Sequence, residues 1–321
     1  MSGLASAAKT ALITGVTGQD GSYLAELLAG KGYRVVGTSR CPPATHPGGV
    51  ELRALDPVDF EGMRALVGEL APDELYHLAG QSSVGFSFEE PRKSFESIAT
   101  SSLNVLDAVR AGSPATRVFI AGSGEVFGEC DAGPADETTP FRPRSPYAAA
   151  KAAAAELTRV YRSAYGLFAC VGFLFNHESP RRPERFVTRR ITAGARAIAL
   201  GTATDLTLGD LRVVRDWGWA PEYVEAMWRM LARDVADDFV LATGEAHSLE
   251  EFVELAFAEH GLAARDHVRI DPARYRPSEV RVLRGNPLRA EEQLGFSPRV
   301  HFAEVVSRLV AAENDRAKPS A

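Results

Sequence analysis

The amino-acid sequence predicts an α/β protein built on a doubly wound parallel β-sheet. Through the first 175 residues, short apolar runs alternate with segments of helical periodicity. The apolar runs are rich in β-branched residues and lack an alternating polar face, which is typical of parallel strands covered by helices on both sides. A glycine-rich segment, TGVTGQDG, also follows the first apolar run, where such folds hold a strand-to-helix turn.

The elements of this sheet are expected in the order strand, helix, strand. We predict helices in SYLAELLAGKG, which begins near Ser22, and in DFEGMRALVGEL and SLNVLDAVRAG. The expected strands are TALITG, YRVVGTS, ELYHLAG and RVFIAGS. A longer helix should start at about Pro146, because Ser145 suits its N-cap, proline its first turn and Gly166 its C-terminal stop. FACVGFLF then indicates another buried strand.

The pattern of the chain changes beyond residue 177. HESPRRPERF is rich in proline and arginine, and the remaining sequence predicts shorter and less regular elements. We therefore expect the doubly wound domain to occupy residues 1–175. A smaller α/β domain over residues 176–321 should supply substrate contacts. A segment near 210–245, such as 238–244, is expected to return to the main sheet.

The composition narrows the class of protein. With 321 residues, 45% of them hydrophobic and 24% charged, the chain resembles an ordinary soluble enzyme. Its net charge of −6 argues against nucleic-acid binding. Cys41, Cys130 and Cys170 show no CxxC spacing, so neither a disulfide framework nor a metal site is expected. No apolar run has the length of a signal peptide or a membrane span, so we expect a cytoplasmic protein without membrane contact.

Three glycines, Gly15, Gly18 and Gly21, have the GxxGxxG spacing of a dinucleotide site. Glycines let the backbone approach a pyrophosphate closely, and the following helix offers N–H groups and the positive end of its dipole. The position between a first strand and a first helix favours this interpretation over a glycine-rich turn without function. At the end of the second strand, where an acidic residue would select NAD, the chain has Arg40, which can contact a 2′-phosphate. NADP is therefore favoured over NAD, and a surface arginine is the alternative interpretation.

Tyr147 and Lys151 lie four residues apart and therefore share one face of the long helix. A phenol has an unperturbed pKa of about 10 and needs a nearby cation to act as a base at neutral pH. Lys151 and the positive ring of a nicotinamide cofactor would supply that charge. Ser123, in the turn after RVFIA, is a third candidate catalytic residue. Surface packing is the alternative explanation of an isolated tyrosine–lysine pair.

The glycine pattern, Ser123 and the YxxxK motif together resemble the extended short-chain dehydrogenase/reductase family. Within it, the chain is similar to the GDP-mannose 4,6-dehydratase family in the strings ITGVTGQDGSYLAE, PRSPYAAAK, FNHESPRR, RDWG with YVEAMW, and RPSEV. The similarity extends from residue 10 to residue 312, so it includes the second domain. It implies a Rossmann-type NADP-binding domain, a nucleotide-sugar-binding domain and the dehydration of a GDP-sugar.

The resemblance also implies a mechanism. Tyr147, assisted by Lys151 and Ser123, would remove the proton of the sugar 4-hydroxyl while hydride leaves C4. The resulting ketone acidifies the C5 proton, a base removes it, the 6-hydroxyl leaves as water, and hydride returns to C6. Glu125, in GSGEVFG, matches the family's base position, two residues after the serine. A simple ketoreductase would not need this carboxylate, and the alternative is a glutamate with only a structural role in the turn.

Further residues match binding positions of the family. Besides Tyr147 and Lys151, the implied cofactor contacts are Gly15, Thr17, Gly18, Gln19, Asp20, Gly21, Arg40, Asp56, Leu78, Ala79, Gln81, Ser82, His177 and Arg182. The implied contacts to the GDP-sugar are Ser82, Ser123, Asn176, Arg190, Arg215, Arg276 and Glu279. Arginines suit a diphosphate, and a glutamate can accept hydrogen bonds from guanine. Solvated surface charge is the alternative for each charged residue in this set.

The chain departs from the family pattern at several positions. Gly124 stands where the family has serine and related dehydratases have an acidic aspartate. Either Glu125 serves as both base and acid, or water assists, or the elimination is impaired. Cys41 replaces a second arginine after the second strand, which bears on NADP binding and on tetramer formation. We expect a homodimer, with a tetramer possible.

These departures keep other activities open. Lys93, Gly80 and Arg281 also differ from the family, and such changes would fit a GDP-heptose in place of GDP-mannose. The SGE string resembles the SGD of related reductases. An NADPH-dependent GDP-4-keto-6-deoxy-sugar reductase or epimerase is therefore the alternative enzyme, and an NADP-binding scaffold is the alternative outside catalysis.

Overall fold

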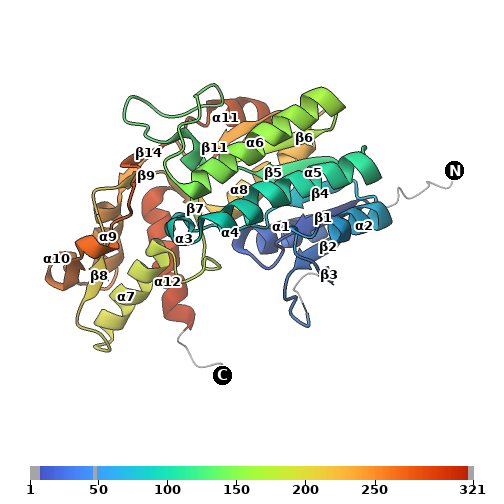
Figure 1. Ribbon diagram of the computed structural model, residues 1–321. Coiled ribbons are helices and arrows are strands. Elements are labelled where there is room, and N and C mark those ends of the chain that lie inside the picture. Colours follow the sequence, from blue (N-terminus) through green and yellow to red (C-terminus); the bar gives the residue numbers. More distant parts are fainter. Residues whose placement is uncertain (1–7, 46–48, 317–321) are drawn as a thin grey trace.

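The computed structural model describes residues 8–45 and 49–316, and its centre is a seven-stranded sheet (Figure 1). All neighbouring strands are parallel, in the order β11-β6-β5-β4-β1-β2-β3. The strands are β1 Thr10–Thr14, β2 Arg34–Ser39, β3 Glu51–Ala54, β4 Glu74–His77, β5 Arg117–Ala121, β6 Ala169–Leu174 and β11 Phe239–Leu241. The strand order runs outward in both directions from the boundary between β1 and β4. The predicted doubly wound α/β fold is confirmed.

Helices cover both faces of this sheet. One face carries α1 Gln19–Gly30, α8 Ala220–Leu231 and α11 Leu288–Leu294. The other face carries α2 Phe60–Leu70, α5 Ser101–Gly112 and α6 Pro146–Tyr165. Each layer has its own apolar cluster, with Met227 buried in the first and Leu106 in the second. The strands are apolar on both sides because each side faces one of these clusters.

Local signals predict the helix boundaries with different success. Ser145 caps α6 by accepting the Ala148 N–H at 3.1 Å, and Gly166 ends it with a φ of 69°. The predicted start of α1 near Ser22 is wrong, because this helix begins at Gln19. The Gly18 N–H donates to the Gly15 carbonyl at 3.0 Å, and this turn brings the chain into the helix three residues earlier.

The chain after β6 returns to the sheet and also builds a second core. β11, within the segment 238–244, pairs with β6 at the edge of the sheet. The second core is formed by α7 Val187–Ala199, α9 Leu249–Ala258 and α12 Phe302–Arg316, which lie to one side of the sheet in Figure 1. The division into domains at residue 175 stays a prediction. Among residues 8–45 and 49–316, none of the helices combines the length and the apolar character that a membrane span requires.

Short strands form three further small sheets in the described part of the chain. They comprise β7 Asn176–Glu178 with β10 Trp217–Trp219, β8 Leu206–Leu208 with β13 Val268–Ile270, and β9 Val214–Arg215 between β12 His247–Ser248 and β14 Val282–Leu283. The remaining helical segments are α3 Val84–Glu89, α4 Pro91–Phe95, a π-helix η1 Glu96–Thr100, a 3₁₀ helix η2 Gly124–Phe127, α10 Ala264–His267 and a 3₁₀ helix η3 Pro272–Arg274.

Candidate functional site

Two glycines of the glycine-rich turn between β1 and α1, Gly15 and Gly21, have no room for side chains. Gly15 has a φ of 75°, and a Cβ there would lie 2.8 Å from the Ala79 backbone. A Cβ on Gly21 would lie 2.3 Å from the Gly15 carbonyl oxygen. Gly18 is the N-cap of α1, and no side chain caps this end of the helix. The turn therefore presents backbone N–H groups and the positive end of a helix dipole, and this arrangement fits the pyrophosphate of a dinucleotide.

Arg40 and Asp56, two of the residues expected at the cofactor, follow the carboxyl ends of β2 and β3. The Thr17 hydroxyl donates to Ser39 Oγ at 3.4 Å, and the exposed Arg40 follows β2 directly. Asp56 is exposed after β3, where its carboxylate accepts the Val58 N–H at 3.1 Å. An arginine, and no acidic side chain, therefore occupies the end of β2.

The segment after β4 packs against the glycine-rich turn. It holds four of the expected cofactor contacts, namely Leu78, Ala79, Gln81 and Ser82. The Leu78 N–H donates to the carbonyl of Thr14 at 3.2 Å, and the Ala79 N–H donates to the Thr14 hydroxyl at 3.3 Å. Ser82 is exposed. This is the point where the strand order reverses, and doubly wound sheets bind their ligands at such a point.

A partly buried ion pair joins the glycine-rich turn to β7. His177 donates from Nε2 to Asp20 Oδ2 at 3.0 Å and from Nδ1 to the Phe175 carbonyl at 2.7 Å, so both ring nitrogens carry protons. Burial alone would lower the pKa of His177, but the Asp20 carboxylate raises it above its usual value. Burial would raise the pKa of Asp20, but the His177 charge lowers it. The His177 ring also stacks on Tyr223, with 4.7 Å between ring centroids.

Gln19 and Arg182 complete this network. Gln19 donates from Nε2 to the His177 carbonyl at 3.1 Å, and its Oε1 accepts the Ser179 hydroxyl at 2.8 Å. Arg182 donates to the same carbonyl at 3.3 Å and lies 3.1 Å from the Glu178 carboxylate. Four of the residues expected at the cofactor, from two distant parts of the chain, are therefore brought together.

Ser123, Tyr147 and Lys151 meet beyond the carboxyl end of β5. Ser123 is the N-cap of η2, and Tyr147 and Lys151 lie on α6. Lys151 Nζ donates to the Ala121 carbonyl at 2.7 Å and lies 5.9 Å from the Tyr147 ring centroid. Burial raises the pKa of Tyr147 to about 12, although a hydrogen bond with Ser123 opposes this rise. Burial lowers the pKa of Lys151 to about 8. The chain's own residues thus leave the phenol protonated at neutral pH, so a base at Tyr147 requires a further positive charge.

Glu125 lies in the same turn as Ser123. Its side chain is half-buried, its N–H donates to Ser123 Oγ at 3.3 Å, and its charge raises the pKa of Tyr147. The neighbouring Gly124 faces the buried ring of Phe175, and a Cβ at this position would lie 2.9 Å from two ring atoms. A side chain at position 124 would therefore run into Phe175, so Glu125 is the acidic group that this turn offers for chemistry.

Three of the residues expected to bind the substrate contact one another, because two arginines donate to the carboxylate of a glutamate. Glu279 Oε1 accepts from Arg215 at 2.8 Å and from Arg276 at 3.0 Å. Arg215 is nearly buried, whereas Arg276 and Glu279 are partly exposed. The three side chains come from β9 and from the segment before β14, and they form a charged group that can bind polar ligand atoms.

Arg190 and Asn176 lie on other elements. Arg190, on α7, donates to the Thr207 carbonyl at 3.1 Å, and burial together with the charge of Arg274 lowers its pKa. Asn176 begins β7 and pairs with Trp217 of β10. Sequence reasoning placed these two residues with the arginines above, but the described contacts do not join them to that group.

Phe175 and Tyr223 were not predicted as residues of the site. Phe175 occupies the space beside Gly124, and the Tyr223 ring stacks on the His177 ring. Both are buried aromatic residues whose sequence context indicates only a core position. Their role depends on tertiary contacts, so the sequence pattern holds no signal that distinguishes them from ordinary core residues.

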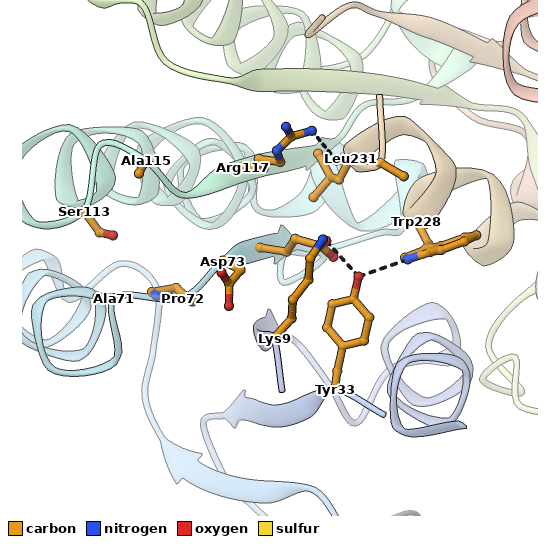
Figure 2. A pocket seen from close by; sticks show the side chains of 12 residues that line it. Lys9, Tyr33, Ala71, Pro72, Asp73, Ser113, Ala115, Arg117, Trp228 and Leu231 are labelled. Carbon is orange, nitrogen blue, oxygen red and sulfur yellow. Dashed lines mark hydrogen bonds and ion pairs between the residues drawn. The ribbon is translucent and has the colours of Figure 1, made fainter. Parts of the chain in front are cut away.

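A separate cavity of about 430 Å³ lies at the opposite edge of the sheet, where β4 and β5 begin (Figure 2). The buried Glu74 carboxylate accepts the Tyr33 hydroxyl at 2.9 Å and Lys9 Nζ at 3.3 Å. Trp228 donates to the Tyr33 hydroxyl at 3.2 Å, and Arg117 donates to a carbonyl at the end of α8 at 2.9 Å. Ligands of doubly wound sheets bind at the carboxyl ends of the strands, so we interpret these contacts as an anchor for α8.

Comparisons with known proteins agree with this arrangement. A family model described as GDP-mannose 4,6 dehydratase matches residues 12–309. The chain is 46% identical over 329 residues to GDP-mannose 4,6 dehydratase 2 of Arabidopsis thaliana, which covers 97% of this chain and 88% of that protein.

Solved structures resemble the whole fold. UDP-glucose 4-epimerase of Thermus thermophilus in complex with NAD aligns with a TM-score of 0.85 and 28% identity, over 95% of this chain and 99% of the other. RMD from Pseudomonas aeruginosa complexed with NADPH aligns with a TM-score of 0.81 and 25% identity, over 96% and 100%. The parallel sheet, the glycine-rich turn and the family match together show that this chain belongs to the GDP-mannose 4,6-dehydratase family of extended short-chain dehydrogenases/reductases.

Proposed function

We propose that this protein is a nucleotide-sugar 4,6-dehydratase that converts GDP-mannose, or a closely related GDP-sugar, to the GDP-4-keto-6-deoxy sugar. The observation that carries the proposal is Glu125, a half-buried carboxylate in the turn of Ser123 that acts electrostatically on Tyr147. A ketoreductase needs only the serine, tyrosine and lysine, whereas elimination of water needs an additional base. Membership of the family supports the same reaction.

The cofactor of this proposal is NADP. The glycine-rich turn would hold its pyrophosphate, Arg40 its 2′-phosphate, and the segment 78–82 its nicotinamide half. The hydrogen bond between Asp20 and His177 supports this placement, because it ties the turn to β7. The NAD and NADPH bound to the two similar structures support a nicotinamide cofactor in general. When bound, NADP would supply a hydride acceptor for C4 and a hydride donor for C6, so it would not be consumed.

The residues of the chain would move the protons. Tyr147 would take the proton of the 4-hydroxyl, with Ser123 hydrogen-bonded to the same oxygen. Lys151, through its charge, would lower the pKa of the phenol in the assembled site. Glu125 would remove the C5 proton and deliver it to the 6-oxygen, which departs as water and leaves a C5–C6 double bond. As C6 receives the hydride, Glu125 would pass a proton taken up from solvent to C5. Because Gly124 supplies no second acid, one carboxylate serves each of these transfers.

The GDP half of the substrate would be held by charged residues of the C-terminal part. Arg215 and Arg276 would contact the diphosphate, and Glu279 would accept hydrogen bonds from guanine. Arg190 and Asn176, on α7 and β7, would complete the site, with Ser82 and Ser123 beside the sugar. The shared carboxylate of Glu279 supports the grouping of the first three residues.

The experiment that tests this function uses GDP-mannose, a catalytic amount of NADP and deuterated water. We expect a 4-keto-6-deoxy product that carries deuterium at C5, with no net change in the cofactor. Glu125→Gln keeps the size and polarity of the side chain, and we expect it to lower the rate by about 10²- to 10⁴-fold. Consumption of NADPH in a fixed ratio to product, from a 4-keto sugar, would show a reductase instead.

We also propose that the protein works as a homodimer, with a tetramer as the alternative. Apolar side chains are exposed on the outer helices α4, α5 and α6, namely Phe95, Leu103 and Val160. Such side chains support contact with a second copy. Sedimentation equilibrium distinguishes the dimer from the tetramer, and a monomer at micromolar concentration would contradict the proposal.

A further inference from the structure

His77, the last residue of β4, is a buried imidazole that the proposed reaction does not use. Only 3% of the residue is exposed. Its Nδ1 lies 2.8 Å from the Thr14 hydroxyl of β1, and its Nε2 lies 3.0 Å from the Ser101 hydroxyl at the start of α5. The ring therefore connects two elements that border the expected cofactor site.

Ser101 determines the direction of these hydrogen bonds. Its hydroxyl lies 2.7 Å from the Ser97 carbonyl, closer than the 3.0 Å to Nε2 of His77, so we assign its single proton to that carbonyl. With this assignment Nε2 of His77 donates to Ser101, and the Thr14 hydroxyl, which already accepts the Ala79 N–H, is left to donate to Nδ1. Burial, and then the charge of Lys151, lower the pKa of His77 to about 3. The ring is neutral at physiological pH, so its Nδ1 accepts the proton of the Thr14 hydroxyl.

The two ends of this hydrogen-bond chain hold the segment after β4. The Thr14 hydroxyl accepts the N–H of Ala79 at 3.3 Å. Ser101 donates to the backbone carbonyl of Ser97 in the π-helix η1. The side-chain hydroxyl of the same Ser97 accepts the N–H of Gln81 at 3.3 Å. The Ala79 backbone packs directly against Gly15, where a Cβ would lie only 2.8 Å away. A displacement of Ala79 would therefore also change the packing of the glycine-rich turn.

We propose that His77 is a positioning residue for the nicotinamide cofactor, whose neutral ring fixes the segment 78–82 against the glycine-rich turn through Thr14 and Ser101. The inference rests on the proposed cofactor site. The direction of the bonds is essential, because a doubly protonated ring could no longer accept from Thr14. It would also place a second positive charge near Lys151.

The test is the NADPH affinity of matched variants, measured by fluorescence titration. Ser101→Ala breaks the chain, whereas Ser102→Ala removes an equally buried hydroxyl of the same helix that donates only to the Ile98 carbonyl, at 2.6 Å. We expect His77→Leu and Ser101→Ala to weaken NADPH binding about tenfold, equivalent to about 1.4 kcal/mol. Ser102→Ala should change it less than twofold. His77→Asn keeps an acceptor toward Thr14 and should recover most of the affinity.

GDP binding provides the second readout, because a general loss of structure would weaken it as well. We expect GDP affinity to stay within twofold of the parent in all four variants. Unchanged NADPH affinity in Ser101→Ala would overturn the proposal, and so would an equal loss in Ser102→Ala. If His77→Leu does not fold, the two serine variants decide the question. A parent that binds NADPH without dehydrating a GDP-sugar would refute the proposed reaction and leave this test valid.

Discussion

Gly124→Ser is the substitution that most directly tests the geometry of the catalytic turn. It would restore the residue of the family pattern, but its Cβ would lie 2.9 Å from the Cε2 and Cζ atoms of Phe175. The ring is 2% exposed and is bordered by a second glycine, Gly285, whose own Cβ would also lie 2.9 Å from Cε2. The ring therefore has little space to move away.

The expected loss of stability follows from two opposing effects. Overpacking of this kind costs about 1–3 kcal/mol, while replacing a glycine stabilises by about 0.4–1 kcal/mol through the unfolded state. We expect Gly124→Ser to lower the free energy of unfolding by about 1–2 kcal/mol. Gly68→Ser is the control, because no heavy atom lies within 4 Å of a Cβ at that position. It should be as stable as the parent or slightly more stable.

Urea unfolding, followed by tryptophan fluorescence, measures these differences. A double variant with Phe175→Leu should be destabilised by less than the sum of the single variants, because the smaller side chain gives space to the serine. The turnover number of Gly124→Ser should not exceed that of the parent, since the new hydroxyl faces Phe175. A variant that is as stable as the parent and turns over faster would refute the reasoning, because the hydroxyl would then reach the substrate.

Three further predictions concern the cofactor site. Tyr147→Phe should lower the turnover number by at least about 10²-fold while NADP affinity, measured by titration, changes less than threefold, because only the acid–base hydroxyl is lost. Gly21→Ala should abolish NADP binding without weakening GDP binding, because its Cβ would lie 2.3 Å from the Gly15 carbonyl oxygen; retained NADP affinity in calorimetry would contradict this geometry. Asp20→Asn should destabilise by about 1–3 kcal/mol at pH 6 and by less at pH 9 in urea unfolding. His177, whose pKa Asp20 raises, stabilises fully below its unfolded pKa of about 6.5, and this contribution is lost as the pH rises through the folded pKa; a larger difference at pH 9 would be inconsistent with the ion pair.

The sequence predicted those parts of the fold whose causes are local. Ser145, Pro146 and Gly166 define α6 because caps and stops act within a few residues of each helix end. The start of α1 was predicted too late, because it depends on a backbone hydrogen bond between Gly18 and Gly15 that no residue preference reveals. β3 was not predicted, since its short sequence ELRA is polar and only partly buried at the edge of the sheet.

In the candidate site, too, local patterns could be predicted from the sequence, whereas contacts between distant elements could not. Motif spacing predicted that Tyr147 and Lys151 share one face of α6, because residues four apart on a helix lie together locally. The contact of the Phe175 ring with Gly124 and the tautomer of His77 could not be predicted from the sequence. Both depend on side chains from elements that are distant in sequence and meet only in the folded chain.

The parallel pairing of β11 with β6 bears on whether the N-terminal part of the chain can fold as a separate fragment. Residues 1–175 alone lack that edge strand and also α8 and α11, so the apolar side chains of Phe119 and Leu174 would face water. Such a fragment would expose an open strand edge and aggregate. The sheet is therefore completed only by segments of the C-terminal part, so residues 1–175 are not an independent folding unit.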